Sequence, residues 1–318
     1  MQTYILRRLL QMIIVLFIVT LIVFFLLRLL PGDPILMYLS QQDLEQITEE
    51  QVDIIKRNLG LDRSLPIQYF SWLGNTLKGD LGTSIIHHGK VIEDIKKRVP
   101  ITLHLGIMAF VLSIIVGIPF GVIAAVKRGT WLDNILTTFG NIGITTPNFW
   151  LGILLIYFLG YKVNLLPIFG YTSPFKDFWL NTRQIIMPVV VLAAAPIATG
   201  VRISRSSMLE ILQQDYIRTA WSKGLHERSI IVKHALRNGL LPVVAMKGIS
   251  LAAIIGGSVV VETVFSIPGM GRLAVEGLFS KDYPVVQATI LVIALFTLMA
   301  NLLIDLSYGW LDPRIRYG

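Results

Sequence analysis

The chain contains no cysteine among its 318 residues, so it forms neither a disulfide framework nor a metal site built on thiolates. Charged residues are also scarce at 15%, whereas hydrophobic residues make up 54% and the mean hydropathy is +0.67. An ordinary soluble domain carries about a quarter charged residues, so this composition excludes that class. The sequence therefore predicts a protein that lies in a lipid bilayer.

Long apolar runs set the predicted architecture, because crossing the hydrocarbon core takes about 20 apolar residues as a helix. The fourth run is the weakest, since Pro188 and Pro196 interrupt it. The first follows Arg7 and Arg8 but ends without a small-residue cleavage site, which favours a retained anchor over a secretory signal. The prediction is an all-α polytopic fold with six transmembrane helices, at residues 9–27, 101–126, 135–160, 185–201, 240–261 and 285–304.

Lys and Arg residues are unevenly divided between the two predicted sides of the membrane. The side with both termini and the loops 127–133 and 202–238 carries 13 of them, against 5 in the opposite short loops, or 8 when Lys96, Lys97 and Arg98 are added. The positive-inside bias therefore predicts cytoplasmic termini. The net charge of +8 needs no nucleic acid, because basic residues beside helix ends serve insertion and contact with anionic membrane lipid.

The segment 31–100 is predicted to be a small folded cap on the opposite side. Thr48 and Gln51 form a capping box for one helix, which Gly60 closes. A second helix is predicted after Pro66, where Ile67, Phe70, Leu73 and Leu77 recur at helical spacing. The predicted divisions are an N-terminal transmembrane helix at 1–30, an extracytoplasmic helical cap at 31–100 and a five-helix core at 101–318.

A basic polar stretch, RTAWSKGLHERSIIVKHALRNGLLP at residues 218–242, separates two very apolar parts of the chain within the cytoplasmic loop 202–239. YIRTAW extends a helix, Gly224 breaks it, and ERSIIVKHALR is amphipathic before Gly239. The pattern predicts two short helices with a hinge, and we call this protrusion, residues 216–239, the knuckle. A rigid protrusion suits a subunit that receives mechanical work from another protein. The alternative interpretation is a solvated connector.

A resemblance favours the first interpretation. RTAWSKG resembles the E-A-A-x-x-x-G signature of ABC-importer membrane subunits, with Arg218, Thr219, Ala220 and Gly224 at the marked positions. The longer stretch RSSMLEILQQDYIRTAWSKGLHERSIIVKHALRNGLLPVV resembles permeases of the dipeptide, oligopeptide and nickel group of binding-protein-dependent importers. Further matches cover residues 1 to 316, in RLLPGDP, KGDLGTSI, TPNFWLGILLIYFLG, VVETVFSIPGMGRLAV, DYPVVQA and LDPRIR.

Departures from the general signature are confined to a few positions. Arg218 and Thr219 replace its Glu and Ala, and Arg237 stands where many importers have a proline, with Pro242 five residues later. These departures are typical of the peptide branch of the family, so they narrow the resemblance to that branch.

The resemblance implies a type I ABC-importer permease fold and a coupling role for the knuckle, which would dock in a groove of a cytoplasmic ATPase. The contact residues that we expect are Thr219, Ala220, Gly224, Leu225, Glu227 and Arg228. The implied partners are a second homologous permease, two ATP-binding subunits and an extracytoplasmic solute-binding protein, in a prokaryotic inner or plasma membrane. The implied role is half of a translocation pathway for peptides.

We expect ATP hydrolysis to be carried out by partner subunits and not by this chain. The sequence has no G-x-x-x-x-G-K-[ST] motif, and its one Gly-Lys pair, Gly89 and Lys90, lacks the preceding glycine. We therefore expect a non-enzymatic subunit with no cofactor of its own, and ATP bound by partner subunits. His87 and His88 are adjacent and point apart, so no metal site is predicted.

Lys247 is an ionisable residue inside a predicted span, and such residues often mark functional sites. It lies five residues past Pro242, so it can snorkel to the interface, line the pathway, pack against another helix or take part in proton coupling. Gly248, Ala252 and Gly256 recur every four residues, which indicates close helix packing or a border of the solute cavity. These four residues are the predicted pathway positions.

Two other classes of function remain open at this point. An ion-driven secondary transporter would need intramembrane carboxylates, which the predicted spans lack. An intramembrane enzyme would need a catalytic constellation, and the sequence suggests none. Within the resembling family, the sequence leaves dipeptides, longer peptides, nickel and oligosaccharides all open as the solute.

Overall fold

The computed structural model describes residues 2–29 and 62–311, so the predicted helix after Thr48 lies outside the described residues. The described chain is helical, and its extended pairing is limited to an isolated bridge between Thr83 and Lys90. This confirms the all-α prediction. The helices form two compact units.

Unit 2 joins the N-terminal part of the chain to a later segment, Leu6–Thr102 with Pro268–Phe296. Its helices are most of α1 (Gln2–Leu29), α4 (Leu65–Leu77), the start of α5 (Val91–Val126), α13 (Met270–Phe279) and the start of α14 (Tyr283–Leu311). One buried apolar cluster joins α5, α13 and α14, and a second joins α1 to α14 through Val23, Leu27 and Val286.

Helix α4 forms where the apolar spacing predicted it, with Pro66 in its first turn. Its buried residue is Tyr69, whose hydroxyl lies 2.9 Å from Thr20 Oγ1 of α1 and whose ring meets Phe24 edge to face. The helix is therefore oriented by aromatic packing on α1. Most of the apolar residues that predicted the helix stay exposed within this chain, namely Ile67, Phe70 and Leu77.

Asp282 joins two of the sequence motifs in unit 2. Its buried carboxylate accepts a hydrogen bond from the Ser84 hydroxyl and from the backbone N–H groups of Ile85 and Val285, at 3.3 and 3.4 Å for the latter two. The loop KGDLGTSI is thereby held against the start of α14, where DYPVVQA begins.

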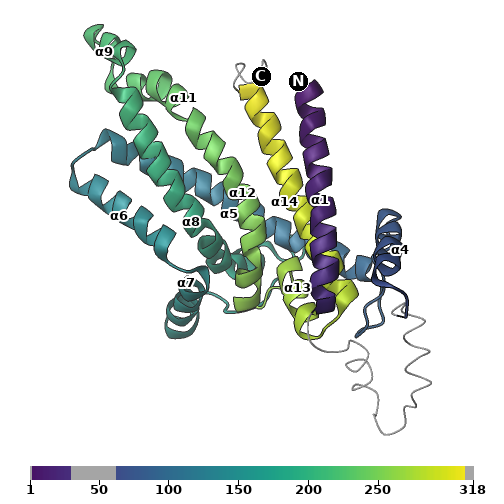
Figure 1. The fold of residues 1–318 in the computed structure, drawn as a ribbon. Helices are drawn as coiled ribbons and strands as arrows, with labels where there is room; N and C mark the ends of the chain where they lie inside the picture. The colour runs from purple at the N-terminus through teal and green to yellow at the C-terminus, as the bar shows by residue number, and fades with distance from the viewer. Residues whose placement is uncertain (1, 30–61, 312–318) are drawn as a thin grey trace. The chain divides into compact units, whose positions relative to one another are not determined.

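Unit 1, which contains Leu103–Ile267, is built around one long helix, α8 (Phe178–Leu212). Helices α6 (Trp131–Thr145), α7 (Asn148–Leu155) and α12 (Leu241–Val264) contact it, as Figure 1 shows. Glycines allow these contacts to be close. A Cβ at Gly121 of α5 would lie 2.6 Å from the Val201 carbonyl oxygen, and one at Gly143 would lie 3.0 Å from that of Ala194.

Four helices are long and apolar enough to cross a membrane: Ile5–Leu29, Val91–Val126, Phe178–Leu212 and Tyr283–Leu303. They match four of the six predicted stretches. The predicted fifth stretch forms α12, a helix of 24 residues, or about 36 Å at 1.5 Å per residue. The multi-pass class is confirmed, whereas the number of six crossings stays a prediction.

The third predicted stretch, 135–160, is not a straight helix. Trp131–Thr145 and Asn148–Lys162 are bent by 109° relative to each other, so they form either a broken span or a re-entrant turn. The physical cause is Thr146-Pro147: a residue before proline avoids the helical region, and both residues are extended, with ψ of 122° and 135°.

The prolines of α8 have the opposite outcome. Pro188 and Pro196 lie inside a helix of 35 residues that continues through both, so the weakest of the predicted stretches forms a long helix. Each proline removes one backbone donor, and neighbouring helices supply the packing that keeps such a helix intact.

Candidate functional site

The knuckle lies at the end of α8, where Figure 1 shows α9 at its tip and α11 leading back into α12. It consists of α9 (Asp215–Ser222), a turn, α10 (Glu227–Ser229), a π-helical turn η3 (Ile230–Ala235) and α11 (Leu236–Gly239). The turn is made possible by Gly224, whose φ of +71° is rarely adopted by other residues. A Cβ at Gly224 would meet no atom within 4 Å, so the turn is open on its outer side.

Beneath this turn the knuckle has its own apolar core. Ile217, Ala220, Ile230 and Ala235 are buried together with Met208 of α8 and with Ala125 at the end of α5. Each large buried aliphatic side chain of this kind contributes about 2–5 kcal/mol relative to alanine. The knuckle is therefore packed on two membrane helices and is not a solvated connector.

Close backbone packing fixes the far end of the knuckle as well. A Cβ at Gly239 would lie 2.7 Å from the Met208 sulfur, and the Ser207 hydroxyl donates to the Gly239 carbonyl oxygen at 2.8 Å. The Asn238 amide donates to the Tyr216 hydroxyl at 3.1 Å, which joins the last turn to α9. Movement of the knuckle must therefore involve α8.

The predicted contact residues fall into two groups. Thr219, Gly224, Leu225, Glu227 and Arg228 are exposed on the knuckle. Ala220, in contrast, is only 7% exposed and packs inward, so it does not form part of this surface in the single chain. Its small side chain lets α9 lie close to α8.

An exposed aromatic residue on the same surface was missed. Trp221 is 48% exposed and lies in α9, next to Ala220 and three residues before Gly224. The signal was present in RTAWSKG, because a tryptophan is rarely placed in water without a partner and is enriched at protein interfaces.

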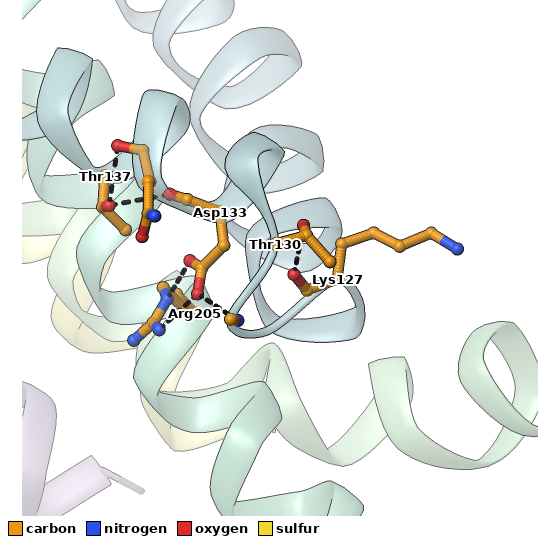
Figure 2. A network of polar contacts seen from close by, with 7 residues as sticks. Lys127, Thr130, Asp133, Thr137 and Arg205 are labelled. Carbon is orange, nitrogen blue, oxygen red and sulfur yellow. Dashed lines mark hydrogen bonds and ion pairs between the residues drawn. The ribbon is translucent and has the colours of Figure 1, made fainter.

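A second polar arrangement, drawn in Figure 2, ties the α5–α6 turn to α8. Arg205 Nε and Nη2 donate to the two carboxylate oxygens of Asp133 at 2.7 and 2.8 Å, and the Gly129 N–H donates to one of them at 3.0 Å. The Asp133 side chain is 4% exposed and that of Arg205 is 28% exposed. This bidentate pair was not predicted, although opposite charges at the ends of two apolar segments are its sequence signal.

Lys247 does not snorkel. It is 5% exposed, and its ammonium group donates to the Pro196 carbonyl at 2.7 Å, to the Ser113 carbonyl at 3.0 Å and to the Ser113 hydroxyl at 3.1 Å. A Cβ at Gly200 would lie 2.8 Å from Nζ, so glycine leaves room for the ammonium. In the part of the chain that the structure describes, no carboxylate pairs with Lys247. The residue links α12 to α5 and α8.

The remaining predicted pathway residues all lie on α12. Gly256 is exposed, and a Cβ there would meet nothing within 4 Å. Gly248 and Ala252 are within the helix, but their surroundings lie outside the description. His87 and His88 are exposed, and no cluster of three metal-ligating side chains occurs among the described residues.

These features define a class: a polytopic helical membrane subunit that carries a helical knuckle packed on its long central helix. The particular family follows from two family models. The binding-protein-dependent transport system inner membrane component matches residues 117–317, and the N-terminal component of the same transport systems matches residues 1–106. The chain belongs to this family of ABC transporter permeases, and it is an inner membrane, multi-pass protein.

Curated relatives match over the full length of the chain. The Probable peptide ABC transporter permease protein y4tP of Sinorhizobium fredii is 40% identical over 317 residues, and both chains are covered completely. The oligopeptide transport system permease protein AppB of Bacillus subtilis is 39% identical over 324 residues with the same coverage. The glutathione transport system permease protein GsiC of Pectobacterium atrosepticum is 38% identical over 317 residues, again with both chains covered.

The fold is also similar to that of a solved transporter. An inward-facing structure of the MetNI methionine ABC transporter matches with a TM-score of 0.58 and 19% identity, covering 70% of this chain and 97% of that chain. This match shows the type I importer permease fold.

Proposed function

We propose that the chain is the permease subunit of an ABC importer for peptides and that its knuckle couples a separate ATPase to transport. Family membership gives the transport role. The observation that supports the coupling role is how the knuckle is attached: its exposed turn at Gly224 packs on a buried apolar core shared with α8 and α5. A surface mounted in this way transfers an applied displacement to membrane helices.

The names of the relatives support a peptide solute. Two of them are named for peptide or oligopeptide transport and a third for glutathione, which is itself a small peptide. Nickel or an oligosaccharide is the alternative solute within the family. We propose that the subunit performs no chemistry and holds no cofactor, and that ATP is bound by partner subunits.

The partners that this role requires are a second homologous permease, two ATP-binding subunits and an extracytoplasmic solute-binding protein. The excess of Lys and Arg in the loops supports cytoplasmic termini and a cytoplasmic knuckle. An ion-driven transporter is less well supported, since Lys247 is hydrogen-bonded to neutral acceptors alone in the described structure.

The test is to co-express the tagged chain with its genomic neighbours and to measure whether an ATPase co-purifies whose hydrolysis is stimulated by loaded binding protein. Gly224→Leu adds bulk and strain at the exposed turn, so we expect it to abolish the stimulation and the uptake. Gly224→Asn tolerates a positive φ and should retain more of both.

Gly79→Leu is the matched control. Gly79 also has a positive φ, +86°, and open space at its Cβ, but it follows α4 in unit 2 and is not part of the knuckle or its core. It should retain stimulated hydrolysis if the knuckle is the contact. Equal losses in the two leucine variants, or full stimulation in Gly224→Leu, would refute the coupling role. Failure of any ATPase to co-purify would refute the importer assignment itself.

A further inference from the structure

A polar cavity of about 420 Å³ opens between α6 and α8 in unit 1. Its polar lining consists of Thr137 and Asn141 from α6 and of Arg202, Arg205 and Ser206 from α8. Among the described residues, no acidic side chain lines it. The cavity is separate from the knuckle surface and from the contacts of Lys247.

The neighbouring carboxylate of Asp133 neutralises Arg205 and leaves the positive charge of Arg202 in the cavity. Both oxygens of Asp133 are already occupied by Arg205, and one of them also accepts from the Gly129 N–H. Arg202 is exposed and has no hydrogen-bond or ion-pair partner in the described part of the chain. Its guanidinium offers five N–H donors in a planar fork, a geometry that matches a phosphate or a carboxylate.

The predicted level of the cavity in the bilayer indicates which of these anions it meets. Arg202 follows directly after the apolar stretch 185–201 of α8, so it is predicted to lie where that helix leaves the hydrocarbon. Trp131, at the start of α6, is 68% exposed, and exposed tryptophans are typical of the headgroup level of a bilayer. The excess of Lys and Arg predicts that this is the cytoplasmic leaflet, where anionic lipids are concentrated.

We propose that this cavity binds the phosphate of an anionic phospholipid, with Arg202 as its principal ligand and Asn141 and Ser206 as further donors. The Asp133–Arg205 pair orients the wall of the site and keeps its carboxylate from competing for Arg202. A lipid held there would contact both α6 and α8.

The experiment is native mass spectrometry of the detergent-purified full chain with its co-purifying partners, after addition of phosphatidylglycerol or phosphatidylcholine. Each basic residue near a membrane surface changes lipid affinity by about fivefold, and a bidentate ligand by more. We therefore expect Arg202→Gln to lower phosphatidylglycerol retention at least about fivefold and Arg202→Lys to lower it less. Because Arg202 makes no hydrogen bond or ion pair with any described residue, its replacement should not change the thermal midpoint when no lipid is added.

Arg218→Gln is the matched control, since it removes an exposed arginine of the knuckle and should leave lipid retention unchanged. Equal retention in the wild type and in Arg202→Gln would overturn the proposal. Displacement of the lipid by millimolar inorganic phosphate would overturn the lipid as the source of the phosphate. Displacement by a peptide, together with loss of peptide uptake in Arg202→Gln, would assign the cavity to the transported solute instead.

Discussion

The Asp133–Arg205 pair gives the sharpest prediction about stability. Removing one partner of a buried ion pair costs about 3–5 kcal/mol, because the other charge stays buried without compensation. The Asp133 side chain is 4% exposed, and in Arg205→Gln its carboxylate loses its charged partner while the hydrogen bond from the Gly129 N–H remains. Because the Arg205 side chain is 28% exposed, water can enter after the change, so we expect the lower end of this range, about 3 kcal/mol.

Two further variants of the same pair should fall in a fixed order. In Asp133→Asn one oxygen still accepts from Arg205, but the new amide faces the donors that the other oxygen served, which costs about 2 kcal/mol. Arg205→Lys keeps the charge and loses the second hydrogen bond, so it should cost about 1 kcal/mol. The double variant Asp133→Asn with Arg205→Gln should be no less stable than Arg205→Gln alone, since no buried charge is left unpaired.

Equilibrium unfolding of the purified chain in mixed detergent micelles would measure these differences. Arg202→Gln, three residues away on α8, is the control and should lie within about 0.5 kcal/mol of the wild type, because Arg202 makes no hydrogen bond or ion pair with any described residue. The reasoning fails if Asp133→Asn and Arg202→Gln unfold at the same point, or if the double variant shows the sum of the two single losses.

Three other predictions concern the links within unit 1. Lys247→Met should cost about 1 kcal/mol, since three hydrogen bonds are lost but a desolvated charge is removed as well; a loss above about 4 kcal/mol in the same unfolding assay would contradict this account. Gly200→Ala should destabilise the wild type by about 1–3 kcal/mol and the Lys247→Met background by less, and equal costs would show that the ammonium is not the obstacle. Ile217→Ala should cost about 2–5 kcal/mol and weaken co-purification of the ATPase, because Ile217 belongs to the knuckle core. Trp221→Ala should weaken co-purification without lowering stability, because Trp221 is exposed. A pull-down and thermal midpoints of both variants test this, and a stable Ile217→Ala beside a destabilised Trp221→Ala would refute the division between core and surface.

The parts of the fold that the sequence predicted are those set by local patterns. Apolar runs located the membrane helices, the spacing after Pro66 located α4, and Gly224 located the turn of the knuckle. The bend in the third stretch was also readable in principle, since Thr146-Pro147 carries its cause in two adjacent residues.

The features that were missed depend on residues distant in the chain. Asp133 and Arg205 are 72 positions apart, and Lys247 and Ser113 are 134 apart, so neither pairing leaves a local signal. Snorkelling was a reasonable interpretation of Lys247 from its depth alone. It is wrong because Gly200 and the Pro196 carbonyl create an internal place for the ammonium, which requires knowing how α8 and α12 meet.

The links in unit 1 converge on one element. The knuckle core joins α8 to the end of α5, the Asp133–Arg205 pair joins the α5–α6 turn to α8, and Lys247 joins α12 to both α5 and α8. Helix α8 has 35 residues, or about 52 Å at 1.5 Å per residue, so it is long and apolar enough to reach from the knuckle across a membrane. A displacement applied at Gly224 therefore cannot be absorbed in a flexible connector. We expect it to tilt α8 together with the helices that are hydrogen-bonded to it, and for that reason weakening any one of these links should reduce coupling before it reduces membrane insertion.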